Sequence, residues 1–513
     1  MCRSSHSRSF WSGDGKSMDL GGFEEMIEVK NASFHYRGDS KSALDNISVS
    51  IAKGQCILCC GMSGSGKTTF TRLLNGLIPH FYKGNLEGEV WIDKKEIRHW
   101  DSGSLAQKVG SVFQNPRSQF FNLDTLSEMA FGLENMGVPG EQIKKRIAQV
   151  ADELEIWPLM GRAITDLSGG EKQMIAMAAV YAINPDIFVL DEPTANLDLL
   201  AIEKLRRVLE GLKKSGKTII IAEHRTSYLR EWVDRVLLFE NGKIVEDWSG
   251  EDFRKLEGAA LQQRGLRSHC CQTAKTKAET RDFNNYPILL SQVQSGYRRG
   301  KNILKNVSLE MGQGEVIGVI GHNGQGKSTL AKTLCGLVKE SKGQIQFNQR
   351  AVKSRQRLKN SYLVMQSPDY QLFYESVWKE MLEAGGKNHR QGKAMCSQLL
   401  KDLDLEKLGQ KHPMDLSGGE KQRLVVGTAL MKDAKILIMD EPTSGLDYRH
   451  MCQVACLIRN LQRQGKIILL ISHDYELIMS ACTRIIEMQG GQVVRDYPLE
   501  QGYFQELKAF FKL

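Results

Sequence analysis

The eight residues Gly61–Thr68, GMSGSGKT, match the phosphate-binding pattern G-x-x-x-x-G-K-[ST], and Gly321–Ser328, GHNGQGKS, match it a second time. The glycines let the backbone approach phosphate oxygens, and the amide groups and the start of the following helix then face the negative charge. One such motif can be a chance glycine-rich turn. Two copies, each followed by the same later motifs, indicate a duplicated nucleotide-binding domain.

Three further motifs follow each phosphate-binding loop in the same order. They are Leu-Ser-Gly-Gly-Glu, an apolar run ending in Asp-Glu-Pro, and a lone histidine: Leu167–Glu171, Asp191–Pro193 and His224 in the first half, and Leu416–Glu420, Asp440–Pro442 and His473 in the second. The offset between the halves is 249 for the serine (417−168), the aspartate (440−191) and the histidine (473−224). This constant offset indicates that the parts keep their relative positions in both copies.

The length of 513 residues suits two domains better than one core. We expect a disordered lead-in at residues 1–25, a first domain at 26–256, a polar linker at 257–285 and a second domain at 286–513. As a flexible coil, this linker spans about 30 Å, roughly one domain diameter, so the two halves can meet within one chain.

The composition is that of an ordinary globular protein, with 41% hydrophobic and 25% charged residues. No apolar run approaches the roughly 20 residues that a membrane crossing needs, so a membrane process would require another chain. The net charge of +9 is a mild excess over this length, which fits proximity to anionic lipid or nucleic acid and equally well a solvated surface with two sites for a polyanion. We expect no nucleic-acid partner.

Short apolar runs precede the phosphate-binding loops and the Asp-Glu pairs, as in Val316–Ile320, Ile187–Leu190 and Ile436–Met439. Such runs are typical of parallel strands buried on both faces, and α/β sheets bind ligands at the carboxyl ends of these strands. We therefore expect an α/β fold in each half. Ile27–Val29 and Ile47–Ile51 alternate like strands of a separate small sheet.

The phosphate-binding loops and the strand ends carry the expected chemistry. Lys67 and Lys327 would reach the β- and γ-phosphates of a nucleotide, and Thr68 and Ser328 would hold Mg²⁺. Asp191 and Asp440 suit Mg²⁺ through water, while Glu192 and Glu441 suit polarisation of the attacking water. The alternative that one carboxylate of each pair only caps the following turn stays open.

Ser168 and Ser417 each open an apolar helix with a glutamate three residues later, which is a capping box. The two glycines between them also expose N–H groups at the positive end of a helix, which is a second anion site. Each domain thus carries two anion sites for one nucleotide.

These motifs together resemble ABC ATPase cassettes, over essentially all of both halves. The resemblance implies an α/β fold of tandem P-loop NTPase domains, each with a parallel-sheet core, a small antiparallel β subdomain and a helical subdomain. It implies head-to-tail packing with ATP and Mg²⁺ held between the halves. Lys67 would then face Ser417–Gly419, and Lys327 would face Ser168–Gly170.

The resemblance assigns further roles. Tyr36 and Tyr297 would stack on adenine, Gln114 and Gln366 would sense Mg²⁺ and the membrane partner, and His224 and His473 would contact the γ-phosphate, although ordinary structural roles for the tyrosines and histidines stay open. Asn196–Asp198 and Gly445–Asp447 would be the loops that cross the dimer. The expected nucleotide-binding residues are Tyr36, Gly61, Ser63, Gly64, Ser65, Gly66, Lys67, Thr68, Thr69, Gln114, Ser168, Gly169, Gly170, Tyr297, Gly321, Asn323, Gly324, Gln325, Gly326, Lys327, Ser328, Thr329, Gln366, Ser417, Gly418 and Gly419. The expected metal residues are Thr68, Gln114, Asp191, Ser328, Gln366 and Asp440, and the expected catalytic residues are Glu192, Glu441, His224 and His473.

Departures from the family pattern are small. Met174 stands where the second half has Arg423, and Ala195-Asn196 stands where it has Ser444-Gly445. Neither change removes a catalytic group, so we expect two competent sites.

A second pattern narrows the resemblance. Gln114–Phe121 and Gln366–Phe373 share the form Q-x-P-x-x-Q-apolar-Phe, which resembles energy-coupling-factor (ECF) ATPases, as does Ala222–Arg225. In that group, ATPases on the cytoplasmic face of the membrane drive uptake of vitamins or of cobalt or nickel ions. The expected partners are a transmembrane coupling protein and a substrate-binding membrane protein. The alternative that the apolar pairs of this pattern only fill the local core stays open.

Two other functions stay open. A tandem ATPase of a sugar-type importer is one, although its second half is often degraded and the second half here keeps its motifs. A soluble ribosome-associated tandem ABC protein is the other, although its linker is typically long, charged and helical, unlike residues 257–285.

Overall fold

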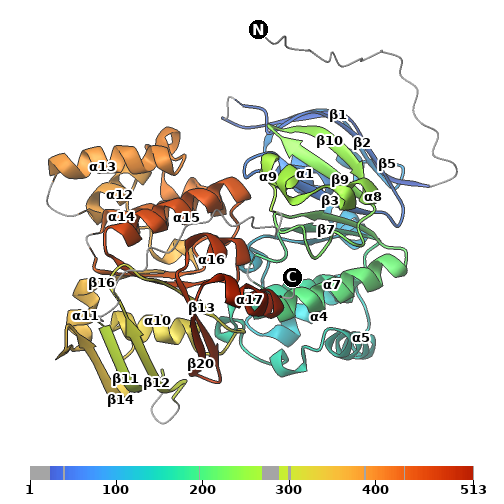
Figure 1. Ribbon diagram of the computed structural model, residues 1–513. Coiled ribbons are helices and arrows are strands. Elements are labelled where there is room, and N and C mark those ends of the chain that lie inside the picture. Colours follow the sequence, from blue (N-terminus) through green and yellow to red (C-terminus); the bar gives the residue numbers. More distant parts are fainter. Residues whose placement is uncertain are drawn as a thin grey trace, which may run out of the picture.

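The computed structural model describes residues 24–38, 41–195, 197–267, 288–297, 302–385, 389–432 and 434–511. The expected lead-in, apart from residues 24 and 25, lies outside this part of the chain, as do Asn196 and most of the expected linker. The described residues form two halves of the same architecture, which Figure 1 shows side by side.

Each half contains a four-stranded antiparallel sheet. In the first half its order is β2-β1-β4-β5, and in the second β12-β11-β14-β15. Its strands are β1 (Glu25–Tyr36), β2 (Leu44–Ala52), β4 (Gly84–Ile92) and β5 (Lys95–Glu96), and β11 (Ile288–Ser295), β12 (Leu304–Met311), β14 (Glu340–Phe347) and β15 (Arg350–Ala351).

Each half also contains a six-stranded sheet. All its strands are parallel except the edge strand that comes last in the sequence, β10 in the first half and β20 in the second. The orders are β10-β9-β3-β8-β7-β6 and β16-β17-β18-β13-β19-β20. Its strands are β3 (Cys56–Gly61), β6 (Val109–Val112), β7 (Ile187–Asp191), β8 (Thr218–Ala222), β9 (Arg235–Glu240) and β10 (Lys243–Ser249), and β13 (Val316–Ile320), β16 (Ser361–Val364), β17 (Ile436–Asp440), β18 (Ile467–Ile471), β19 (Arg484–Gln489) and β20 (Gln492–Pro498).

Helices cover these sheets and form a separate helical part in each half. The first half has α1 (Lys67–Leu74), α2 (Leu77–His80), α3 (Ser102–Lys108), α4 (Thr125–Asn135), α5 (Gly140–Glu153), α6 (Gly169–Ile183), α7 (Leu199–Lys214), α8 (Gly250–Lys255) and α9 (Gly258–Gln263). The second has α10 (Lys327–Cys335), α11 (Ser354–Asn360), α12 (Val377–Ala384), α13 (His389–Asp402), α14 (Gly418–Met431), α15 (Tyr448–Arg463), α16 (Tyr475–Ala481) and α17 (Phe504–Phe511).

The helix α6 shows why the sequence folds this way. Its N-cap Ser168 and its third residue Glu171 satisfy each other's backbone N–H groups, at 3.3 and 2.7 Å. Its side chains are apolar and buried around most of its circumference because α4, α5 and β6 pack against it. The Leu-Ser-Gly-Gly-Glu segment of each half (Leu167–Glu171 and Leu416–Glu420), named the signature segment below, therefore leads into a helix whose N-terminus is fixed by a capping box.

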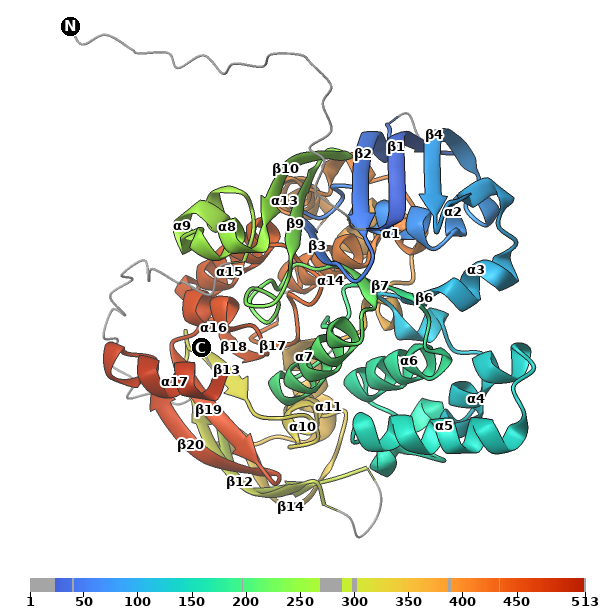
Figure 2. The same cartoon turned by 90° about the vertical axis from the view of Figure 1, so that its right-hand side faces the viewer.

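The predicted fold class is confirmed: parallel cores, small antiparallel sheets and helical parts occur in both halves. The two antiparallel sheets lie at opposite ends of the molecule (Figure 2). This placement is that of a head-to-tail pair. Among the described residues, no helix combines the length and apolarity that a membrane crossing requires.

The first half extends further than the sequence prediction. The helix α9 and the residues up to Arg267 lie inside the expected linker, yet Leu261 and Leu266 are buried in the core of the first half. The polar residues around them hide this contact, because two leucines are enough to fix a short helix against a core but give no periodic pattern.

Leu261→Ala should therefore destabilise the first half. Removing a buried leucine side chain costs about 2–5 kcal/mol, which should appear as a lowered midpoint in thermal unfolding followed by circular dichroism. The exposed neighbour Gln263→Ala is the matched control and should change stability by less than about 0.5 kcal/mol. Equal midpoints for both variants would contradict the packing of α9.

Candidate nucleotide sites between the halves

Each phosphate-binding loop joins a buried strand to a helix and holds its own lysine. Lys67 Nζ donates to the carbonyls of Gly61 and Met62, at 3.0 and 2.9 Å, and Lys327 Nζ does the same in the second loop, at 2.5 and 2.9 Å. Both lysines are buried, and this burial lowers the pKa of each. The two cationic groups are thus fixed at helix N-termini, where a phosphate would compensate their desolvation.

A hydroxyl and a carboxylate meet beside each lysine. Thr68 Oγ1 donates to Asp191 Oδ1 at 3.2 Å, and Ser328 Oγ donates to Asp440 Oδ2 at 2.7 Å. Burial raises the pKa of both aspartates, that of Asp191 to about 7. One carboxylate and one hydroxyl fit Mg²⁺, which takes its remaining oxygens from water and from a nucleotide's phosphates and whose charge would favour the ionised aspartates.

The glutamate after each aspartate has a left-handed backbone, with φ of 45° at Glu192 and 53° at Glu441. Such strain in a non-glycine residue persists only where the surroundings impose it, and it is common at active sites. Glu192 Oε2 accepts from Gln114 Nε2 at 2.8 Å, and His224 Nε2 lies 3.3 Å from Glu192 Oε1. Burial would raise the pKa of Glu192, but His224 and then Lys67 bring it below its ordinary value.

The second glutamate has different partners. Glu441 Oε1 accepts from the His473 backbone N–H at 3.0 Å, and Oε2 accepts from Ser472 Oγ at 3.2 Å. Burial raises the pKa of Glu441 to about 7, although Arg225 of the first half opposes this rise. Burial also lowers the pKa of His473 to about 3, and its Nε2 is buried without a hydrogen-bond partner, as is Ser65 Oγ in the first loop. Both atoms can therefore form a hydrogen bond with a ligand oxygen, although His473 Nε2 also lies 3.8 Å from Glu441 Oε1.

Two hydrogen bonds cross between the halves at the phosphate-binding loops. The Ser63 N–H donates to Asp447 Oδ2 at 2.7 Å, and the Asn323 N–H donates to Asp198 Oδ2 at 2.9 Å. Ser444 Oγ also donates to the Ala195 carbonyl at 2.7 Å. The loops Asn196–Asp198 and Gly445–Asp447 are expected from the sequence to reach the opposite half, and their described residues do so. Asn196 itself lies outside the described residues.

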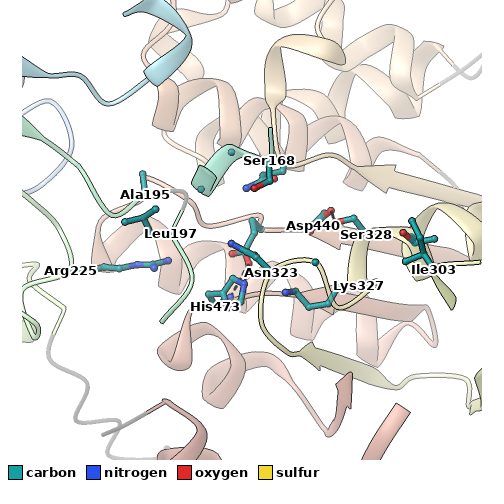
Figure 3. A pocket seen from close by; sticks show the side chains of 17 residues that line it. Ser168, Ala195, Leu197, Arg225, Ile303, Asn323, Lys327, Ser328, Asp440 and His473 are labelled. Atoms are coloured by element: carbon teal, nitrogen blue, oxygen red, sulfur yellow. Dashed lines mark hydrogen bonds and ion pairs between the residues drawn. The ribbon is translucent and has the colours of Figure 1, made fainter. Parts of the chain in front are cut away.

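A pocket of about 220 Å³ combines the phosphate-binding loop of one half with the signature segment of the other. Figure 3 shows Ser168 above the loop that carries Asn323 and Lys327, and the Arg225 side chain pointing toward the pocket from the first half. Its lining residues are Ser168, Gly169, Gly170, Ala195, Leu197, Arg225, Ile303, Asn323, Gly324, Gly326, Lys327, Ser328, Thr329, Gln366, Asp440, Glu441 and His473.

The opposite pairing shows the same arrangement. A Cβ atom added to Gly419 would lie 3.8 Å from Ser63 Oγ, and one added to Gly418 would lie 3.6 Å from Gln114 Nε2. The second signature segment therefore reaches the loop that carries Lys67. Both predicted cross-half pairings are present in the structure as geometry.

The two tyrosines expected near adenine lie beside the loops. The Tyr36 hydroxyl is 3.3 Å from Thr69 Oγ1 and accepts from Arg72 Nη1 at 2.9 Å. Tyr297 is 55% exposed, with Lys332 Nζ 5.3 Å from its ring centroid. Tyr297 is thus more exposed than the half-buried Tyr36, so the two halves present different surfaces to a base.

Sequence reasoning missed two arginines of the interface. Arg225 follows His224 and was noticed only as part of a family pattern, while Arg267 lies in the expected linker. The position of Arg225 beside the histidine is a usable signal; nothing in the polar run around Arg267 indicates its role.

Comparison with known proteins decides the family. Residues 44–195 and 304–444 match the sequence pattern described as ABC transporter. The chain belongs to the ABC transporter family. It is an ATP-binding protein and an ATPase, and the domains of this family bind ATP with Mg²⁺.

Relatives of this ABC protein match along almost their whole length. A putative ABC transporter ATP-binding protein of Treponema denticola is 44% identical over 481 residues, covering 92% of this chain and 97% of that protein. The putative HMP/thiamine import ATP-binding protein YkoD of Bacillus subtilis is 30% identical over 512 residues, covering 94% and 93%.

Among solved structures, the archaeal ribosome recycling factor aABCE1, in complex with the stalk protein aP1, is similar with a TM-score of 0.63. The alignment covers 94% of this chain and 92% of that one at 22% identity, and it shows the fold alone.

The geometry predicts two competent ATP sites in this ABC protein. Glu192→Gln and Glu441→Gln should each leave measurable ATPase activity, whereas the double variant should lose on the order of a hundredfold or more, because neither site then keeps its expected general base. Steady-state phosphate release measures this, with Glu310→Gln on the exposed side of β12 as the control. Activity that disappears in one single variant and is unchanged in the other would contradict it.

Proposed function

We propose that this chain is the ATP-hydrolysing motor of an ECF-type importer. In this role it binds the cytoplasmic face of the membrane as a peripheral subunit and drives uptake of a vitamin or a metal ion through separate membrane subunits. In the same proposal, Glu192, Glu441, His224 and His473 are catalytic, and the cross-half pockets bind Mg-ATP.

One observation carries the proposal: an exposed phenylalanine at the same place in each half. Phe121 is 75% and Phe373 is 79% exposed, whereas their neighbours Phe120 and Leu372 pack into the cores. The alternative that these apolar pairs only fill the core therefore holds for one residue of each pair. A large exposed apolar side chain costs solubility, so two in matched positions favour a binding surface.

These phenylalanines are exposed on an ordered loop. Gln119 bridges the loop by accepting from the Phe113 N–H at 3.2 Å and donating to the Ser111 carbonyl at 3.1 Å. The buried Glu128 accepts from the Phe121 N–H at 3.0 Å. Gln371 and Glu380 make the same contacts in the second half, with donor–acceptor distances of 2.7 Å. The apolar side chains are thus exposed on a loop whose backbone is held in place by hydrogen bonds to buried or partly buried side chains.

The surface around Phe121 is also apolar. Leu123 is 84% and Leu126 is 50% exposed, and Phe121 stacks on Phe131 with ring centroids 5.2 Å apart. In the second half Tyr374 is 37% exposed beside Phe373. Exposed apolar side chains of this kind suit contact with the apolar face of an amphipathic helix of a membrane partner.

The same loops reach the nucleotide sites. Gln114 begins the first loop and donates to Glu192, and Gln366 lines the pocket of Lys327. The loops also contact each other, because Arg117 Nη1 donates to the Tyr370 hydroxyl at 2.5 Å. A partner that moves one loop would therefore move a group bonded to the proposed general base. The thiamine-related name of the Bacillus subtilis relative supports a vitamin as the cargo.

Phe121→Ser with Phe373→Ser should abolish co-purification with the transmembrane subunits and leave the ATPase activity of the isolated chain unchanged. The physical reason is that the contact surface loses its two most exposed rings while the nucleotide pockets keep theirs. The matched control is Leu358→Ser, which changes an exposed apolar residue on α11. Unchanged co-purification, or co-sedimentation of the chain with ribosomes instead of membrane subunits, would overturn the proposal.

A further inference from the structure

Arg267 is a buried arginine that crosses from the first half into the second. It lies four residues beyond α9 and its side chain is 3% exposed. Its Nε and Nη2 donate to the Leu446 carbonyl at 3.2 and 2.7 Å, and its Nη1 donates to Asp474 Oδ2. Glu476 Oε2 is 3.7 Å from Nη1. The guanidinium thus fills a polar site built entirely by the second half.

The backbone of Arg267 belongs to the first half. Its carbonyl accepts from Thr226 Oγ1 at 3.4 Å, and the preceding Leu266 is buried in the first core. Gly265 lies so close to the first phosphate-binding loop that an added Cβ would be 2.9 Å from Met62 Cγ. Arg267 is therefore held beside that loop while its side chain reaches across.

The contacts of Arg267 fix the crossing loop of the second half. Leu446 lies between Gly445 and Asp447, and two hydrogen bonds to one carbonyl hold this backbone in place. Asp474 is itself held, because it accepts from Thr443 Oγ1 at 2.8 Å and from the Leu477 N–H at 3.2 Å. A buried charged pair with these additional hydrogen bonds is costly to break from one side.

This crossing loop contacts the site of Lys67. Asp447 accepts from the Ser63 N–H, and a Cβ added to Gly445 would be 3.4 Å from both Glu192 Oε2 and Gln114 Nε2. A shift of the loop by about 1 Å would move groups beside the proposed general base, and such displacements cost up to about a hundredfold in rate.

The arrangement is one-sided. The residue of the first half that corresponds to Asp474 is Arg225, since 474−225 is 249. An arginine at that position repels a guanidinium, so the crossing loop of the first half cannot be held in this way there. Arg225 lines the pocket of Lys327 instead (Figure 3).

We propose that Arg267 is a positioning residue that holds Gly445–Asp447 against the nucleotide site of Lys67, so that the segment after α9 sets the turnover of this site more than that of the site of Lys327, which Arg267 reaches only through Asp474 and Ser472. The inference rests on the proposed roles of Glu192 and Glu441. It implies that the two sites, although built in the same way, respond differently in turnover to the segment after α9.

The test measures ATP turnover in two backgrounds of the full chain. In Glu441→Gln, where only the site of Lys67 turns over, Arg267→Gln should lower kcat by at least about tenfold with a smaller change in KM. In Glu192→Gln, the same substitution should lower kcat clearly less, by under about threefold, because Arg267 reaches Glu441 only through Asp474 and Ser472. Arg267→Lys, which keeps the charge but not the fork of donors, should restore part of the lost kcat. Arg264→Gln, which removes an arginine of the same segment that contacts Glu246, the Ala260 carbonyl and the Trp248 ring within the first half, is the matched control and should change neither.

Hydrogen exchange separates a failure of this inference from a failure of the site assignment, because it does not depend on which glutamate is the base. Arg267→Lys, and Arg267→Gln where it folds, should speed exchange at residues 445–447 and leave residues 197–198 unchanged. Unchanged exchange at residues 445–447 would overturn the inference that Arg267 holds Gly445–Asp447 in place. Equal loss of turnover in both backgrounds would reduce Arg267 to a structural residue and overturn its site-specific role. If the two glutamate variants do not separate the sites, the site assignment fails, and exchange at 445–447 alone decides whether Arg267 holds the loop.

Discussion

The two halves are held in register by amide groups of the phosphate-binding loops. Ser63 and Asn323 each donate a backbone N–H to an aspartate of the opposite half, Asp447 and Asp198. Each aspartate also caps the helix that follows it, through the His450 and Ala201 N–H groups. A loop that is to surround a phosphate is therefore already tied to the other domain. This makes closure of the pair and formation of the nucleotide pocket one event, which is how binding energy can be transmitted to a partner.

The two nucleotide sites share these bonds between the halves, but the glutamate that follows the strand aspartate, Glu192 or Glu441, has different hydrogen-bond partners in each. In the first, Glu192 is bonded to Gln114 and lies beside His224. In the second, Glu441 is bonded by Ser472 and the His473 backbone and lies 3.8 Å from His473 Nε2, and within the described residues Gln366 makes no hydrogen bond to it. The cause is local: position 223 carries a glutamate that bonds Thr194 Oγ1 at 2.6 Å, and position 472 carries a serine. Duplication preserved the geometry, and single side chains adjusted the electrostatics.

The sequence predicts the chemistry well where all partners lie in one short motif. The lysine loops and the capping boxes of Ser168 and Ser417 are such cases, because their partners lie a few positions apart. The bond between Thr68 and Asp191 spans 123 residues and is predictable only because each residue lies in a recognised motif of the same domain. The expected linker boundary and Arg267 are the opposite case. The partners of Arg267 lie 179 and 207 residues away, and no local pattern encodes a contact of that range. Exposure of Phe121 but not Phe120 also depends on tertiary packing, because Phe120 packs against the core of the first half.

Counting trapped ATP per chain tests the shared pockets most directly. In a chain with Glu192→Gln and Glu441→Gln, adding Lys67→Ala and Ser417→Arg damages a single site in this account, so one ATP should stay bound through rapid gel filtration. Adding Lys67→Ala and Ser168→Arg instead damages both sites, so none should stay bound. The reverse result, with one ATP in the second variant and none in the first, would mean that each half closes on its own nucleotide and would contradict the account.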